Sequence, residues 1–226
     1  KWMGMGHQLI GGMINGVAQP VLVQVMDDKE RQVLVFRKMV RFGAFVSFPA
    51  MLGLAFVAKE FVLILLGEKW LDSVPFLQLF CLWGAMGYLS QLYVNLLMTY
   101  SRSDVYLSGM ILIGLLQILV VWILYPFGVF NMVIGYICVY FFSILFWHYS
   151  VKEELPIKLI SICKDIVPYL VISIFVFFVV DCVLRNISDV YMLLILKILF
   201  SSALYILILL LLKSTILKEA ISYLKR

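Results

Sequence analysis

Long apolar stretches dominate the chain and are separated by short polar connections. A helix needs about 20 mainly apolar residues to cross the hydrocarbon core of a bilayer, which is about 30 Å thick. Because lipid offers no partners to backbone polar groups, continuous runs of this length predict helices. The pattern therefore predicts an all-α, polytopic transmembrane helical bundle of about seven spans. These are residues 2–26, 40–58, 73–99, 105–124, 129–150, 166–184 and 190–212.

Charge is distributed unevenly between alternate connections. Most of the 18 Lys and Arg residues lie in residues 27–41, 100–104, 151–165 and 213–226. Lys and Arg collect in cytoplasmic loops, so we expect these segments and the C-terminus inside the cell. The net charge of +5 therefore indicates membrane orientation and gives no reason to expect a nucleic-acid partner.

Polar residues inside two of the predicted spans share one helical face. In the first span, Gln8 and Asn15 fall seven residues apart. In the third span, Gln91 and Asn95 lie one turn apart and follow two glycines on the same face. Since polar side chains are costly in lipid, such faces line a water-filled cavity or pack against another helix. The pattern leaves both interpretations open.

Two of the basic connections are also amphipathic. Residues 27–41 and 151–165 combine lysines and arginines with regularly placed apolar residues. We expect both to lie along the inner membrane surface, beside anionic headgroups.

The 28 residues from Val40 to Gly67 would make a helix about 42 Å long. This helix therefore tilts strongly or turns along the outer interface at its end.

Asp181 and Lys197 are ionisable residues within the last two predicted spans. Such residues are functional candidates by default. Both lie towards the outer ends of their spans, so Lys197 can reach Asp181 or the outer headgroups. We expect a structural pair or a snorkelling lysine, with a role in ion coupling as the alternative.

The sequence contains no pattern typical of an enzyme. His7 and His148 lie in different spans, without the spacing of metal ligands. There is no glycine-rich phosphate loop, and the four cysteines are scattered without a CxxC pair. We expect no catalytic residues, no metal and no cofactor.

The chain opens on Lys1 within a helix-like pattern, which suggests a piece of a longer protein.

Several motifs resemble the second half of polysaccharide repeat-unit flippases, of the multidrug/oligosaccharidyl-lipid/polysaccharide exporter superfamily. The most specific stretch is Leu65–Trp70 followed by Ser73–Gln78. Gln19-Pro20-Val21 and Phe48–Met51 also match, and Asn95–Met98 leading to Ser101–Asp104 resembles the family's inner-edge motif. Many family members carry Gly where Ser101 stands. The resemblance covers about residues 1–155.

The resemblance implies a fold and a division into domains. Members have two six-helix lobes and, in this branch, two extra C-terminal spans. Residues 1–150 would form five spans of the second lobe. Residues 151–226 would form a basic inner linker, two extra lipid-facing spans and a cytoplasmic tail. The missing N-terminal lobe of the same protein would be a partner of this chain.

The resemblance also implies a function in the bacterial inner membrane. Members flip undecaprenyl-pyrophosphate-linked oligosaccharides across it for capsule, O-antigen or exopolysaccharide synthesis, by alternating access. The partners would be the lipid-linked oligosaccharide and membrane lipids, with the polyprenyl tail in lipid or in a groove beside the last two spans. The expected substrate-binding residues are Gln8, Asn15, Gln91, Asn95 and Arg102. Arg102 would bind the phosphate or take part in gating at the inner mouth of the transporter. The alternative is an ordinary basic residue paired with Asp104. The alternatives are a drug/cation antiporter of the same superfamily and a seven-span receptor or scaffold.

Overall fold

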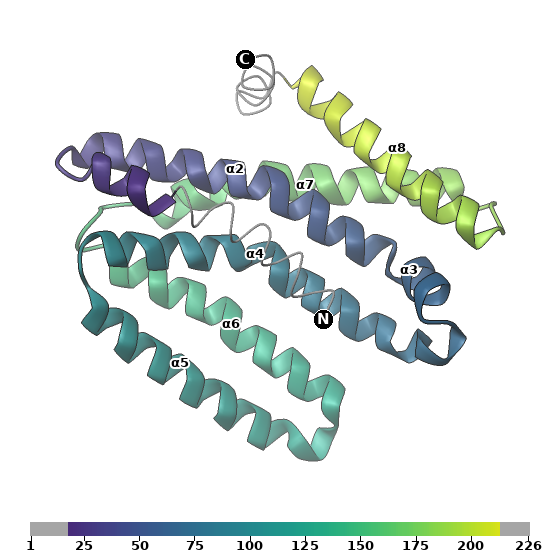
Figure 1. The fold of residues 1–226 in the computed structure, drawn as a ribbon, viewed down its shortest axis with the longest axis horizontal. Helices are drawn as coiled ribbons and strands as arrows, with labels where there is room; N and C mark the ends of the chain where they lie inside the picture. Colours follow the sequence, from purple (N-terminus) through teal and green to yellow (C-terminus); the bar gives the residue numbers. More distant parts are fainter. Residues whose placement is uncertain (1–17, 213–226) are drawn as a thin grey trace.

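A computed structural model describes residues 18–212, which form a bundle of helices without strands (Figure 1). Short 3₁₀ turns at Glu68–Ser73 and Tyr125–Phe127 follow α3 and α5. The all-α class predicted from the sequence is thus confirmed. The helices after residue 28 are α2 (Lys29–Phe56), α3 (Ala58–Leu65), α4 (Val74–Thr99), α5 (Ser103–Leu124), α6 (Val129–Val151), α7 (Leu159–Leu184) and α8 (Val190–Leu211).

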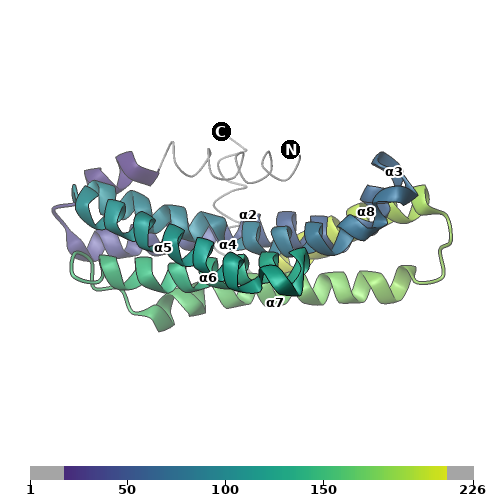
Figure 2. The ribbon, with the colours of Figure 1, turned by 90° about the horizontal axis from the view of Figure 1, so that it is seen from below.

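The long helices pack in an order that differs from their order in the chain. α4 is central, with α2 on one side and α6 on the other, and α5 packs on the far side of α6. α7 packs on α2, and α8 packs mainly on α7 and touches α3. Figure 1 shows this arrangement face-on, and Figure 2 shows the same bundle as a shallow layer seen from its edge.

Five of these helices, α2, α5, α6, α7 and α8, are long and apolar enough to cross a membrane. α4 is 26 residues long and carries no charge, but its amides, glycines and tyrosines keep its hydropathy below that of the others. α4 lies between α2 and α6, so it does not need a fully apolar surface. The first predicted span lies mostly outside the described residues.

Two predicted boundaries were wrong because helices extend into the basic connections. We expected residues 27–41 to form a separate surface segment, but α2 runs unbroken from Lys29 to Phe56. The Asp28 carboxylate caps its start by accepting a hydrogen bond from the Arg31 backbone N–H at 3.0 Å. Likewise, α7 begins at Leu159 rather than at residue 166. The long predicted helix ends at Val57, and α3 turns away as a separate short helix.

Close packing between α2 and α4 forms the centre of the core. Phe36, Val40, Ala44 and Phe48 recur every four residues along α2 and are fully or almost fully buried. The absent side chain of Gly43 leaves room for the Tyr88 ring, because a Cβ there would lie 2.2 Å from a ring carbon. The Ser47 hydroxyl also donates a 3.0 Å hydrogen bond to the Ala85 carbonyl.

The turn between α4 and α5 explains a family preference. Ser101 has a φ of 56°, in the left-handed region that Gly adopts without penalty. This is the position at which many members of the resembled family carry Gly. The connection is therefore shaped for Gly although this chain carries Ser.

We predict that Gly43→Ala lowers the melting temperature of the protein in detergent. Tyr88 is 2% exposed and cannot move aside, so the added methyl group overpacks the α2–α4 contact at a cost of about 1–3 kcal/mol. Gly114→Ala on α5 is the matched control, because nothing lies within 4 Å of a Cβ there. Equal melting temperatures for the two variants would contradict the tight contact.

Candidate functional site

The predicted substrate-binding residues are only partly covered by the structure. Gln8 and Asn15 lie outside the described residues. Gln91 and Asn95 lie one turn apart on the central helix α4, where Gln91 is half-buried and Asn95 is 7% exposed. The Asn95 carbonyl accepts a 2.9 Å hydrogen bond from the Thr99 hydroxyl. Sugar binding by these residues stays a prediction.

Around Gly84, the same face of α4 packs closely against α2. A Cβ at Gly84 would lie 2.7 Å from the terminal methyl of Met51 on α2. Of the two interpretations of the stripe, packing is therefore correct at Gly84.

Arg102 lies in the α4–α5 connection, where it is paired with two carboxylates. Its Nη1 lies 2.6 Å from Glu154 Oε1, and its Nε lies 3.5 Å from Asp104 Oδ1. The hydrogen bond to Glu154 raises the pKa of Arg102 above its ordinary value, with the charges of both carboxylates acting in the same direction. The expected pairing with Asp104 is present, and Glu154 adds a second partner from the α6–α7 linker.

Further hydrogen bonds tie the basic connections together at this end of the bundle. The Tyr100 hydroxyl donates to the Gln32 side-chain carbonyl, and Gln32 in turn donates to the Leu22 carbonyl at 3.2 Å. Lys29 donates to the Tyr100 hydroxyl at 3.0 Å and also to the Glu154 carbonyl. Three segments expected on the cytoplasmic side are thus in direct contact.

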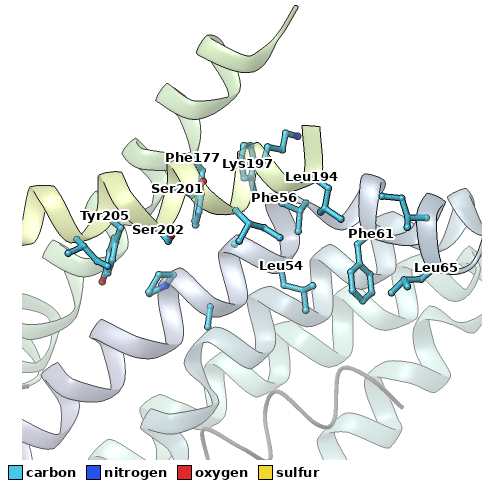
Figure 3. Close-up of a pocket in the computed structure, with 17 residues that line it drawn as sticks. Leu54, Phe56, Phe61, Leu65, Phe177, Leu194, Lys197, Ser201, Ser202 and Tyr205 are labelled. Atoms are coloured by element: carbon cyan, nitrogen blue, oxygen red, sulfur yellow. The ribbon is translucent and has the colours of Figure 1, made fainter. Parts of the chain in front are cut away.

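A groove of about 670 Å³ lies between two walls (Figure 3). α2 and α3 form one wall, and α8 forms the other. Leu54, Phe61 and Leu65 line the first wall, and Leu194 and Ile206 line the second. The α8 residues along it run from 194 to 206, which corresponds to about 18 Å of helix. The groove is long, narrow and mostly apolar.

The end of the groove near α3 carries a buried ion pair. Lys197 Nζ lies 2.9 Å from Glu60 Oε1, and their side chains are 10% and 8% exposed. The ammonium also sits 4.4 Å from the centre of the Phe56 ring. Asp181 is a weaker partner, because its carboxylate is 3.9 Å away and 65% exposed.

A polar stripe continues from Lys197 along the groove-facing side of α8. Ser201 and Tyr205 follow at intervals of four residues, as Figure 3 shows. The Tyr205 hydroxyl donates a 3.0 Å hydrogen bond to the Phe45 carbonyl of α2. The buried Ser201 hydroxyl has no hydrogen-bond partner among the described residues. Among the described residues, the groove therefore combines apolar walls with a buried hydroxyl that has no hydrogen-bond partner.

Sequence reasoning missed the main partner of Lys197, and it named a groove beside the last two spans only through the family resemblance, without the residues that line it. Glu60 follows Lys59 at the end of a predicted span, and two adjacent charges there indicate the outer water boundary rather than a buried ion pair. The spacing of Lys197, Ser201 and Tyr205 was a signal available in the sequence, because residues four apart share a helical face. The expected pair with Asp181 is present only as a second, longer contact.

Comparison with known proteins gives matches to parts of the chain. Residues 1–75 match a family model described as "Polysaccharide biosynthesis protein". The chain is 41% identical over 95 residues to an uncharacterized membrane protein in the cps region of Klebsiella pneumoniae, covering 42% of this chain and 20% of that protein. It is 34% identical over 93 residues to the lipopolysaccharide biosynthesis protein WzxC of Escherichia coli K12, covering 41% and 19%.

A third relative comes from a Gram-positive organism. The chain is 35% identical over 69 residues to the teichuronic acid biosynthesis protein TuaB of Bacillus subtilis 168, covering 30% of this chain and 14% of that protein. No solved structure matches the chain significantly. The matched part spans about a fifth or less of the length of these curated relatives. The matches confirm the family resemblance inferred from the motifs, although the family model ends at residue 75.

We predict that Lys197→Met destabilises the protein by about 3–5 kcal/mol, because it leaves the buried Glu60 carboxylate without a cation. The double variant Lys197→Met with Glu60→Leu should regain most of this loss. Asp181→Asn is the matched control and should have little effect, since Asp181 is exposed. Thermal unfolding in lipid nanodiscs measures all three. A double variant as unstable as the single one would show that the two residues are not coupled.

Proposed function

We propose that this chain is part of a membrane transporter that flips lipid-linked oligosaccharide repeat units for polysaccharide biosynthesis. The observation that carries the proposal is the match of residues 1–75 to a polysaccharide biosynthesis family, together with relatives named for lipopolysaccharide and teichuronic acid synthesis. The substrate would be an undecaprenyl-pyrophosphate-linked oligosaccharide. The remaining lobe of the transporter would face the chain across a central cavity, and the two lobes would rock to give alternating access.

The distribution of charge supports an orientation in the inner membrane. The start of α2, the α4–α5 connection and the α6–α7 linker lie at one end of the bundle, joined by the contacts of Lys29 and Arg102. Because basic connections stay in the cytoplasm, this end is proposed to face inward and the C-terminus to be cytoplasmic. Substrate would then enter at the basic end, where cations can meet a pyrophosphate.

The groove beside α8 suits the lipid part of such a substrate. Its apolar walls present a continuous path of about 18 Å, and a polyprenyl chain gains nothing from polar partners. The exposed apolar side chains on α7 and α8, such as Phe178, Leu199 and Leu207, would face lipid. A tail could therefore pass from the bilayer into the groove without crossing a polar surface.

The buried carboxylates give no support to the alternative of a drug/cation antiporter. Such a transporter needs a buried carboxylate that is free to take up a cation. Glu60 is paired with Lys197, and Asp165 accepts two hydrogen bonds from the Arg37 guanidinium at 2.7 and 3.1 Å. Both carboxylates are thus already compensated by basic side chains of the same chain.

We predict that bacteria lacking the full-length gene lose surface polysaccharide and accumulate lipid-linked repeat units inside the cell. The reason is that repeat units made on the cytoplasmic face would no longer reach the outer face. Surface staining and extraction of lipid-linked sugars measure the two effects, and a plasmid copy of the gene is the control. Normal surface polysaccharide in the deletion strain would refute the proposed function.

We predict that Ser202→Phe impairs export by filling the groove with an aromatic ring. Ser202 lines the groove on α8, and its side chain is exposed there. Ala203→Phe is the matched control, because Ala203 is exposed on the same helix but does not line the groove. Export is compared at equal amounts of protein in the membrane. Equal export by both variants would exclude the groove as the path of the lipid tail.

A further inference from the structure

A second hollow, of about 380 Å³, lies at the basic end of the bundle, where α6 ends and α7 begins. His148, Tyr149 and Lys152 line it from the last turn of α6. Residues 156–160, which lead into α7, form the rest of its lining and include Lys158. Of the described residues, neither Gln91 and Asn95 nor the lining of the groove beside α8 contributes to it.

The hollow is held open by a firmly anchored linker. Leu155 is fully buried and Ile157 is 3% exposed, so the linker is fixed in the core at two points. Glu154 is held by Arg102 at 2.6 Å, and the Tyr93 hydroxyl shares a 2.9 Å hydrogen bond with His148 Nδ1. The shape of the hollow therefore does not depend on a ligand.

Positive charge gathers around this hollow without being neutralised. Lys152 and Lys158 are both exposed, and neither forms an ion pair with another residue in the part of the chain that the structure describes. The carboxylate of Glu154 is engaged by Arg102, and Glu153 does not line the hollow. The hollow lies where the C-terminus of α6 meets the N-terminus of α7, so the two helix dipoles oppose each other and the positive potential comes from the lysines.

The rim of the hollow is apolar and exposed. Tyr149 is 61% exposed and Ile160 is 60% exposed. An aromatic and an aliphatic side chain beside lysines are typical of protein surface at the depth of the lipid headgroups, where aromatic rings are enriched. The hollow thus presents cations toward the headgroup layer and apolar surface toward the acyl chains.

We propose that this hollow binds the phosphate headgroup of an anionic glycerophospholipid from the leaflet at the basic end. Lys152 and Lys158 pair with the phosphate, and Tyr149 and Ile160 contact the glycerol and the first acyl carbons. Basic hollows between helices at this depth are suited to anionic headgroups. A soluble phosphate would use the lysines but gain nothing from the exposed apolar rim.

The test is native mass spectrometry of the full-length protein titrated with phosphatidylglycerol and, separately, with phosphatidylcholine. We expect bound phosphatidylglycerol to exceed bound phosphatidylcholine. The attraction of a lysine to an anionic lipid corresponds to about fivefold in affinity, so Lys152→Gln with Lys158→Gln should weaken phosphatidylglycerol binding by about thirtyfold. Lys164→Gln is the matched control, an exposed lysine on α7 outside the hollow.

Two further arms make the result decisive. The variant Lys152→Arg with Lys158→Arg should retain binding, and the Gln variant should melt at the wild-type temperature in phosphatidylcholine nanodiscs, which shows that it folds. Equal loss of phosphatidylglycerol binding in the Lys164 control would overturn the site. So would displacement of the lipid by millimolar inorganic phosphate, because the ligand would then be the free anion. The measurement needs no transport and therefore stands apart from the proposed function.

Discussion

The structure depends on one constraint: hydrocarbon offers no partner to a polar group, so a charged or polar side chain within the bundle is stabilised when it finds a partner inside the protein. The pairs that satisfy this constraint join the C-terminal helices to the rest of the bundle. Asp165 of α7 is bound by Arg37 of α2, Lys197 of α8 by Glu60 of α3, and the Tyr205 hydroxyl by the Phe45 carbonyl. Residues that are most expensive in lipid thereby fix the places where helices meet.

The same constraint explains the position of α4. The amide side chains and glycines of α4 would be unfavourable in contact with lipid. The helix lies between α2 and α6, however, and is largely shielded from lipid. Gly84 admits Met51, and the Ala85 carbonyl accepts a bond from Ser47. By contrast, α5 has Gly109 as its one buried residue and carries an almost continuous apolar surface. The amino-acid composition of these two helices therefore reflects how far neighbouring helices cover each of them.

The sequence predicts the ends of most helices closely but not their partners. The expected spans 105–124, 129–150 and 190–212 agree with α5, α6 and α8 within two residues, because hydropathy and turn residues act locally. The start of α2 was missed because charged residues continue the helix beyond the bilayer, and Asp28 alone signals its cap. Glu60 and Lys197 lie 137 residues apart, and Arg37 and Asp165 lie 128 apart. No local pattern relates residues so distant, so these pairs and the residues that line the groove could not be predicted, although the family resemblance implied a groove beside the last two spans.

The placement of these pairs also decides how the groove can behave. Lys197 and Tyr205 tie α8 to α3 and α2 at two points eight residues apart, while the wall between them is apolar except for Ser201 and Ser202, neither of which bonds to another helix. Widening the middle of the groove breaks no hydrogen bond between described residues and costs only contacts that a hydrocarbon chain would replace. A hydrocarbon tail could slide along such a wall without a strong preferred position, as the proposed function would require. Breaking either tether would instead release α8 and expose a buried charge or carbonyl, so the tethers limit the motion to the apolar part.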